Sequence, residues 1–242
     1  MGNFPICHRI LFRFQPMSGG AYILVACGLA FEGRIARASV PDTASAPRVC
    51  RGMLPKRLAA AAGPDCAGII SFGIAGGLDP ELPAGTLVVG SSVIGPSDVW
   101  PTDEEWSRHL LALCPGAVHG ALFGTDAPLR TVAAKEGCFR QTGARAVDME
   151  SHSAARFAAG KNLPFAALRA IADPAGRVVP DLALHGMRPD GALAPLPVLR
   201  ALLAKPGEWA AVLALAGDVF RAARALAGAR RRLGGGFGLD LG

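Results

Sequence analysis

The segment RAVDMESHSAARFAA, residues 145–159, places two carboxylates where a short apolar run passes directly into a helix of small residues. A buried charge must be paired or solvated, so a core built only for packing would not carry Asp148 and Glu150 there. Either these two groups cap and orient the helix, or they face a ligand. The segment by itself leaves both alternatives open.

Further polar groups stand where other apolar runs end. Glu32 follows the run AYILVACG, Asp126 follows ALFGT, Asp173 ends FAALRAIAD, and a glycine-rich stretch, residues 73–77, ends a fourth run. Each is ordinary alone, because an acidic residue suits a first helical turn and glycine or Asp-Pro suits a tight turn. In α/β sheets, however, ligands bind at the carboxyl ends of the strands. We therefore predict one ligand site there, with these side chains and Glu150 as its polar candidates.

Other catalytic chemistries find no support in the residue pattern. None of the six cysteines forms a Cys-x-x-Cys pair or lies near a histidine at zinc-ligand spacing, so we predict no metal ligands. The cysteines are expected to be small buried residues in a reducing compartment. Ser71, His119 and His152 lack the order of a catalytic triad, and residues 73–77 do not match the dinucleotide-binding fingerprint. We predict neither a metal nor an organic cofactor.

The net charge of +6 raises the question of a nucleic-acid partner. The clearest basic run is RAARALAGARRRL, residues 221–233, and elsewhere the basic residues are scattered without interleaved aromatic residues. A solvated helix face explains this run best, a surface for anionic lipid comes second, and nucleic acid comes last. We predict no nucleic-acid partner.

Apolar runs typical of strands alternate with helical segments through residues 21–177. Most of these runs are apolar throughout, as in strands that are covered on both faces. The predicted strands are residues 21–28, 66–80 (running into a glycine-rich turn), 85–95, 116–125 and 163–176, and the predicted helices are 55–63, 102–114, 129–138 and 151–159. We predict an α/β fold with three layers, in which helices cover both faces of a central mixed, largely parallel sheet.

The two ends of the chain differ from this alternating body. Residues 1–20 have neither a long apolar core nor a small-residue cleavage site, so we expect a loosely ordered leader, with Met1 or Met17 as the start. Residues 21–242 are expected to form a single domain, which residues 177–242 complete with a Pro- and Gly-rich loop and two helices. No stretch reaches the roughly 18 apolar residues of a membrane span, and we expect a cytoplasmic protein.

The two helices expected in this tail are residues 197–204 and 208–232. The second has an apolar face made of Trp209, Val212, Leu213, Ala216, Val219, Phe220 and Ala223. This face is expected to pack on the core or on a partner chain, and a membrane surface is the alternative. The glycine-rich end, residues 234–242, is expected to fray.

Four segments carry a resemblance to a known family. SFGIAGGLDPELPAGTLVV, FGTDAPL, AVDMES and LPFAALRAIAD have the order and approximate spacing seen in the nucleoside phosphorylase and methylthioadenosine/adenosylhomocysteine nucleosidase superfamily, which the chain resembles over residues 21–173. GLAFEGRIA, DMESH, IADPA and GMRPDG further resemble its hopanoid-associated phosphorylase branch, to which removal of adenine from adenosylhopane is assigned. The resemblance implies a nucleoside phosphorylase-like fold, a homodimer, and no cofactor apart from phosphate as co-substrate of a phosphorylase.

The resemblance also implies roles for the residues at the strand ends. Asp173 matches the aspartate that donates a proton toward purine N7, and burial should raise its pKa so that it keeps that proton. Glu150 matches the glutamate that holds the ribose hydroxyls, and Met149 matches the apolar residue packed under the sugar. Glu32 matches the carboxylate that activates water in the nucleosidases. Asp148 is expected to be structural.

Other matched positions concern the base and the glycine turn. The resemblance places Asp126, Ala127 and Leu129 in the segment that reads the adenine edge. It places Gly76 and Gly77 in the glycine-rich turn beside the substrate.

Departures from the family pattern favour water over phosphate as the nucleophile. Ser71 and Ile74 stand where family phosphorylases hold phosphate with arginine and serine, although Ser71 remains a predicted substrate-binding residue. Glu32 also stands where those enzymes place an arginine, and its carboxylate would repel phosphate. Arg34 or Arg37 is the alternative anion site.

A second departure concerns the expected acid, because Ala172 replaces the frequent serine before Asp173. We predict hydrolysis of the adenine N-glycosidic bond of a 5′-modified adenosine, with adenosylhopane as the favoured substrate. Three alternatives stay open: phosphorolysis, hydrolysis of methylthioadenosine or adenosylhomocysteine, and a non-catalytic lipid-binding protein on this scaffold. A lipid substrate implies that the segments after Val178 form an apolar groove and contact the inner membrane.

Overall fold

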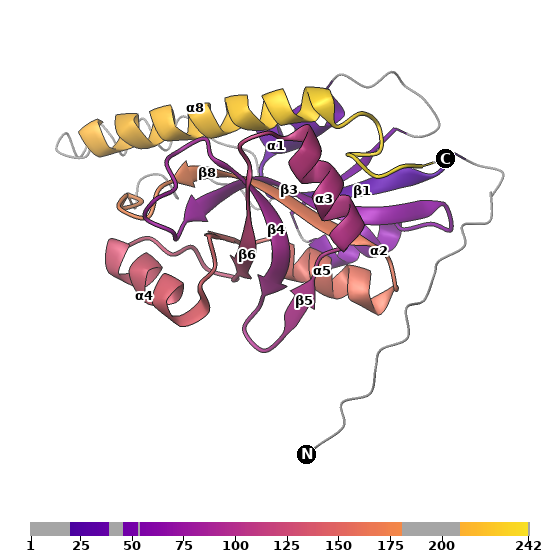
Figure 1. Ribbon diagram of the computed structural model, residues 1–242, viewed down its shortest axis with the longest axis horizontal. Coiled ribbons are helices and arrows are strands. Elements are labelled where there is room, and N and C mark those ends of the chain that lie inside the picture. Colours follow the sequence, from indigo (N-terminus) through magenta and orange to yellow (C-terminus); the bar gives the residue numbers. More distant parts are fainter. Residues whose placement is uncertain (1–19, 39–45, 53, 181–208, 242) are drawn as a thin grey trace, which may run out of the picture.

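A computed structural model describes residues 20–38, 46–52, 54–180 and 209–241 (Figure 1). The expected leader, apart from its last residue, lies outside the described residues. The expected helix 197–204 and the GMRPDG segment also lie outside them. None of the described helices is long and apolar enough to cross a membrane.

Eight strands form one sheet within the described residues. The strands are β1 (Tyr22–Cys27), β2 (Arg48–Arg51), β3 (Cys66–Gly77), β4 (Leu87–Ile94), β5 (Val99–Pro101), β6 (Val118–Gly124), β7 (Ala146–Asp148) and β8 (Phe165–Asp173). The helices are α1 (Ala30–Arg37), α2 (Leu54–Ala61), α3 (Glu104–Leu113), α4 (Val132–Thr142), α5 (Ser151–Gly160) and α8 (Trp209–Arg232). Strands β2 and β5 were not predicted, because with four and three residues they are too short to show a strand pattern.

The strand pairing is mixed, as predicted. The order is β2-β1-β3-β7-β6-β4-β5, and β8 pairs with both β3 and β4, so that β3, β7, β6, β4 and β8 close a ring. Strands β1, β3 and β8 run parallel to one another, as do β4, β6 and β7. The two sets overlap only at their ends, because Gly76 and Gly77 at the end of β3 pair antiparallel with Val147 and Ala146 of the three-residue strand β7. The carboxyl ends of both sets therefore converge on one place.

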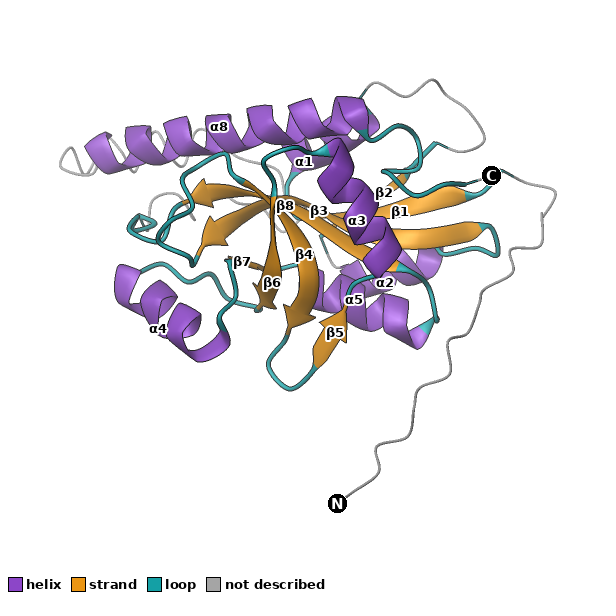
Figure 2. Ribbon diagram, in the orientation of Figure 1, coloured by secondary structure: helices purple, strands orange, loops and turns teal. Residues whose placement is uncertain are grey.

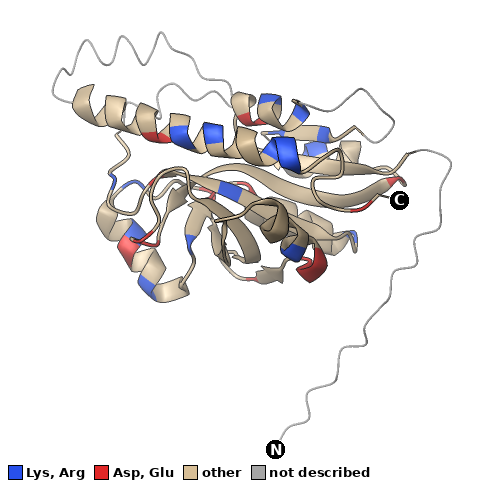
Figure 3. Ribbon diagram, turned by 45° about the horizontal axis from the view of Figure 1, so that its top comes forward, with Lys and Arg blue, Asp and Glu red and all other residues tan. Residues whose placement is uncertain are grey.

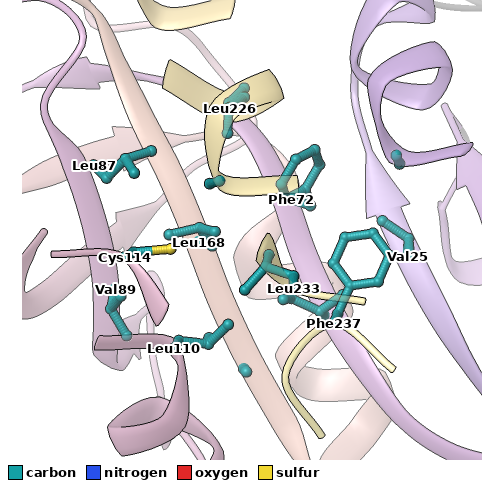
Figure 4. Packing of buried hydrophobic residues seen from close by; sticks show 14 of the residues in the cluster. Val25, Phe72, Leu87, Val89, Leu110, Cys114, Leu168, Leu226, Leu233 and Phe237 are labelled. Atoms are coloured by element: carbon teal, nitrogen blue, oxygen red, sulfur yellow. The ribbon is translucent and has the colours of Figure 1, made fainter. Parts of the chain in front are cut away.

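Helices cover both faces of this sheet, which confirms the predicted three-layer architecture (Figure 2). Residues of α1, α3 and α8 share one hydrophobic core with β1, β3, β4 and β8. Figure 4 shows Leu110, Leu226 and Phe237 packed around Phe72 and Leu168 in this core. Residues of α2 and α5 pack on the opposite face.

Local sequence explains where several helices begin and end. The Asp103 side chain accepts a hydrogen bond from Trp106 N–H at 2.8 Å and starts α3. Thr131 does the same for α4 with Ala134 N–H at 3.2 Å. That helix ends at Gly143, whose φ of 65° is left-handed and suits glycine.

The glycine-rich turn expected at residues 73–77 is wrong, because β3 continues through Gly77. The glycines serve close approach rather than chain reversal. A Cβ on Gly73 would overlap both the Glu32 carboxylate and the Arg169 guanidinium. The strand therefore brings bare backbone against two charged side chains.

The expected fraying of residues 234–242 is also wrong for the part that is described. Phe237 is fully buried, and its ring meets Phe72 edge-on with 5.4 Å between ring centroids. Trp106 Nε1 donates a hydrogen bond to the Phe237 carbonyl at 2.8 Å, and the Arg230 guanidinium lies 4.2 Å from the Phe237 ring centroid. One aromatic residue thus anchors a glycine-rich segment that carries no periodic signal.

The helix α8 packs on the sheet mainly through a different face from the one expected, although Val219 of the expected face does pack against the core. Its buried apolar residues are Ala222, Leu226 and Ala229, whereas Leu213 and Phe220 are 69% and 63% exposed. The sequence pattern missed the buried stripe because small alanines in this helix contact the sheet without a strong apolar signal.

Candidate active site

One cavity lies where the carboxyl ends of the two strand sets converge. Its volume is about 250 Å³, close to the roughly 300 Å³ at the lower end of small-molecule sites. The lining residues are Gly28, Leu29, Phe31, Glu32, Ile74, Ala75, Gly76, Thr125, Pro128, Leu129, Val147, Asp148, Met149, Glu150, Ala172, Asp173, Val179, Leu215 and Val219. Most of this wall is apolar, so a few carboxylates carry its polar chemistry.

Glu32 is buried in the first turn of α1, directly after β1. Its Oε2 accepts hydrogen bonds from the N–H groups of Gly28 and Leu29 at 2.9 and 2.7 Å, and its Oε1 accepts from Ile74 N–H at 2.7 Å. Burial raises the pKa of Glu32, while a neighbouring guanidinium and these N–H groups act in the opposite direction. A carboxylate that is fixed by three N–H groups and made more basic by burial suits the role of a general base.

The positive charge among these carboxylates comes from Arg169, which is fully buried in the middle of β8. Its Nη2 donates to Asp148 Oδ1 at 3.1 Å and to the Ser71 hydroxyl, and its Nη1 lies 3.4 Å from Glu150 Oε2. Burial disfavours the charge, but Asp148, Glu150 and Glu32 outweigh burial and raise the pKa of Arg169. Sequence reasoning missed this residue, whose only signal was a lone charge inside an apolar run.

Glu150 precedes α5 and contributes to the cavity wall. Its carboxylate lies against bare backbone at Gly28, where a Cβ would overlap Oε1. Burial raises the pKa of Glu150 to about 8; Arg169 opposes this shift, and the carboxylates of Asp148 and Glu32 add to it. In the free protein at neutral pH, Glu150 is therefore mainly protonated and can both donate and accept hydrogen bonds.

Asp148 caps the helix that follows it. Its Oδ1 accepts hydrogen bonds from the N–H groups of Glu150 and Ser151 at 2.8 and 2.7 Å, and its Oδ2 accepts from the Ser151 hydroxyl at 2.7 Å. Together with Arg169 these contacts occupy the carboxylate. Asp148 therefore orients the helix, which is the first alternative for the opening segment, while Glu150 faces the cavity.

Asp173 ends β8 and also lines the cavity. Its Oδ2 lies 2.6 Å from Nζ of Lys135, which reaches it from α4. Burial raises the pKa of Asp173, and Lys135 opposes this shift. Ala172 has no hydroxyl that could contact the carboxyl group of Asp173, so this contact comes from Lys135 instead. Sequence reasoning missed Lys135, which lies 38 residues away along the chain.

Six of the ten predicted site residues line the cavity: Glu32, Gly76, Leu129, Met149, Glu150 and Asp173. Gly77, Asp126 and Ala127 lie next to lining residues in the chain but outside the lining itself. The Asp126 side chain is 91% exposed, with Oδ1 3.1 Å from His152 Nε2. Ser71 is fully buried away from the cavity lining, where its hydroxyl bonds to Arg169 and Ser151.

The charges of the site disfavour an anionic ligand. The carboxyl groups of Glu32, Asp148 and Glu150 surround a single guanidinium, that of Arg169. Arg34 and Arg37 are exposed on α1, outside the cavity lining. Within the described part of the chain, no three His, Cys, Asp or Glu residues cluster closely enough to hold a metal ion.

Comparison with known proteins gives a family and a set of similar folds. A family model described as the phosphorylase superfamily matches residues 19–188. No curated protein matches the sequence. The futalosine hydrolase of Helicobacter pylori superposes with a TM-score of 0.62 at 15% identity, covering 86% of this chain and 94% of that one. The 5′-methylthioadenosine/S-adenosylhomocysteine nucleosidase of Neisseria meningitidis, solved with methylthio-immucillin-A, gives 0.62 at 14%, covering 87% and 97%.

Proposed function

The chain belongs to the phosphorylase superfamily, and from this premise we propose that it cleaves the N-glycosidic bond of a purine nucleoside. The proposed reaction is hydrolysis, and the proposed substrate is a 5′-modified adenosine, adenosylhopane. The observation that carries the proposal is the convergence of Glu32, Glu150 and Asp173 on one cavity of nucleoside scale. The fold shared with two nucleoside hydrolases supports it.

Each carboxyl group has a distinct part in the proposed reaction. Glu32 takes a proton from water, which adds to C1′ of the ribose as the bond to the base breaks. Glu150 binds the ribose hydroxyls, and its negative charge stabilises the oxocarbenium-like sugar once its proton has been lost to solvent. Asp173 donates its proton to N7, so the purine leaves as a neutral base. Met149, at 41% exposure on the cavity wall, packs against the sugar.

The electrostatics of the cavity favour water over phosphate. Among the described residues, the only guanidinium in contact with Glu150 is that of Arg169, which is already bonded to Asp148 and Ser71. Phosphate would enter beside the ionised carboxylate that Glu32 needs in order to act as a base, and like charges repel strongly in a poorly solvated site. Arg34 and Arg37 do not face the cavity and offer no compensation.

The apolar part of the cavity suits a hydrophobic 5′ substituent. Leu215 and Val219 of α8 line it together with Val179, so the C-terminal helix forms one wall. On the outer side of α8, Leu213 and Phe220 are exposed, and basic residues recur along its C-terminal half (Figure 3). An apolar and basic surface next to the site supports contact with an anionic membrane that holds the lipid substrate. A homodimer is part of this proposal.

The deciding experiment measures adenine release from adenosylhopane with and without phosphate, beside methylthioadenosine. Release without phosphate supports hydrolysis, and a strict phosphate requirement would establish phosphorolysis. Release from methylthioadenosine alone would refute the lipid substrate while keeping the site. Liposome binding with no adenine release from any nucleoside would refute catalysis.

The lipid substrate has its own test on α8. Leu215→Gln should raise KM for adenosylhopane while leaving methylthioadenosine cleavage nearly unchanged, because only the long substituent needs that wall. The matched control is Leu213→Gln, because Leu213 is two residues away on the same helix and is exposed rather than part of the cavity wall. With adenosylhopane dispersed in detergent, Leu213→Gln should leave KM unchanged. Equal effects of Leu215→Gln on both substrates would count against an apolar 5′ groove.

A further inference from the structure

Lys135 is fully buried, although every other residue of α4 is at least partly exposed. Its Nζ donates to Asp173 Oδ2 at 2.6 Å and to the carbonyl oxygens of Asp173, Pro174 and Arg177 at 3.0, 3.1 and 3.0 Å. A lysine usually extends its charged end into water. This one instead directs it into the turn that follows β8.

The surroundings of Nζ require the charged form. All four neighbouring atoms are acceptors, which suits an ammonium with three N–H donors but leaves no donor for the lone pair of a neutral amine. Burying an ammonium is costly, and a well-packed apolar residue often stabilises such a position as well or better. Stability alone therefore explains this lysine poorly.

We propose that Lys135 is a positioning residue that holds Oδ2 of Asp173 and leaves Oδ1 to the departing purine. The inference rests on the proposed function, because Lys135 acts through the acid assigned there. In the part of the chain that the structure describes, Oδ1 has no hydrogen-bond partner, while Asp173 lines the cavity. The three carbonyl contacts fix the turn from Asp173 to Arg177 and with it the direction of the carboxyl group.

The ammonium also limits how firmly Asp173 holds its proton. Two charged groups on neighbouring helices act on Asp173, namely Lys135 of α4 and Asp218 of α8. Asp218 is itself paired with Arg177 and Arg221. Glu32 and Glu150 line the same cavity as Asp173. Burial and Asp218 raise the pKa of Asp173, and Lys135 lowers it. Without Lys135 the proton would stay on the carboxyl group to higher pH and transfer to the base less readily.

Kinetics of Lys135→Met test the catalytic part. We expect kcat/KM to fall by roughly 10- to 100-fold, as for a misplaced catalytic group. The basic limb of the pH profile should move up by about 1 to 3 pH units, the usual effect of a cation on a neighbouring carboxyl. In an Asp173→Asn background, Lys135→Met should change kcat/KM less than about twofold. Lys56→Met, at an exposed lysine of α2, is the control and should match wild type.

A titration that needs no substrate tests the same contact. The ¹³C signal of the Asp173 carboxyl, identified by its loss in Asp173→Asn, should titrate at higher pH in Lys135→Met and Lys135→Gln than in wild type. If neither variant folds, the ¹⁵Nζ signal of wild-type Lys135 must follow the Asp173 titration. An unchanged carboxyl midpoint in the variants, or an Nζ signal that ignores Asp173, would overturn the inference.

The kinetic outcomes separate this inference from the proposed function. A wild type that releases no base from any nucleoside overturns the proposed function. An active wild type, together with a Lys135→Met variant that keeps its rate and pH profile, overturns the role of Lys135 alone.

Discussion

Substitution of Glu150 should change how stability depends on pH, whatever the substrate. In the folded protein its pKa is raised from 4.5 to about 8. A carboxyl with a raised folded-state pKa contributes stability that is complete below its unfolded pKa and is lost as pH rises through the folded value. The free energy of unfolding should thus fall from near pH 4.5 to about pH 8, because over this range the unfolded chain ionises Glu150 while the folded protein keeps it protonated.

The magnitude follows from the shift. While the unfolded chain is ionised and the folded one is protonated, they differ by one proton, which corresponds to about 1.4 kcal/mol per pH unit. Between pH 5 and pH 8 this amounts to about 4 kcal/mol. Glu150→Gln removes the proton equilibrium and keeps the shape, so its stability relative to wild type should rise by about that amount across this range.

Urea unfolding followed by circular dichroism at half-unit steps of pH measures the effect. The matched control is Glu136→Gln, because Glu136 is an exposed carboxylate paired with Arg140 on α4. Its pH curve should run parallel to that of wild type. Parallel curves for Glu150→Gln and wild type would refute the reasoning, because they would mean that Glu150 is as ionised in the folded protein as in the unfolded one.

Three further outcomes follow from the same contacts. Asp173→Asn should fold normally and lose most adenine release, and a wild-type rate would remove Asp173 from the mechanism. Arg169→Met should lower the free energy of unfolding at pH 8 by about 3–5 kcal/mol, because it leaves buried carboxylates unpaired, and by less at pH 5; a pH-independent loss would contradict this. Phe237→Ala should cost about 3–5 kcal/mol in urea unfolding, whereas exposed Phe220→Ala should cost less than about 0.5; equal costs would argue against a packed C-terminus.

Much of the fold and part of the site could be predicted because their signals are local. Apolar runs such as AYILVACG mark strands that are covered on both faces. Asp103 and Thr131 cap helices through hydrogen bonds to residues only three positions further along the chain. Carboxylates at strand ends mark the cavity, because parallel strands of a sheet bring their carboxyl ends together. Glu32, Glu150 and Asp173 were found in this way.

What only the tertiary structure decided depends on contacts between distant segments. Arg169 bonds to Ser71 across 98 residues, and Lys135 bonds to Asp173 across 38. Trp106 meets Phe237 across 131 residues, which turns a glycine-rich end into part of the core. A charge inside an apolar strand, or a lysine in a mostly exposed helix, gives no local sign of its partner. The sequence alone determined which elements form and that carboxyl groups stand at the ends of strands. The packing of the elements decided which cations face those carboxyl groups. The physical reason is that a buried charge is tolerated only where the folded chain supplies its counter-charge.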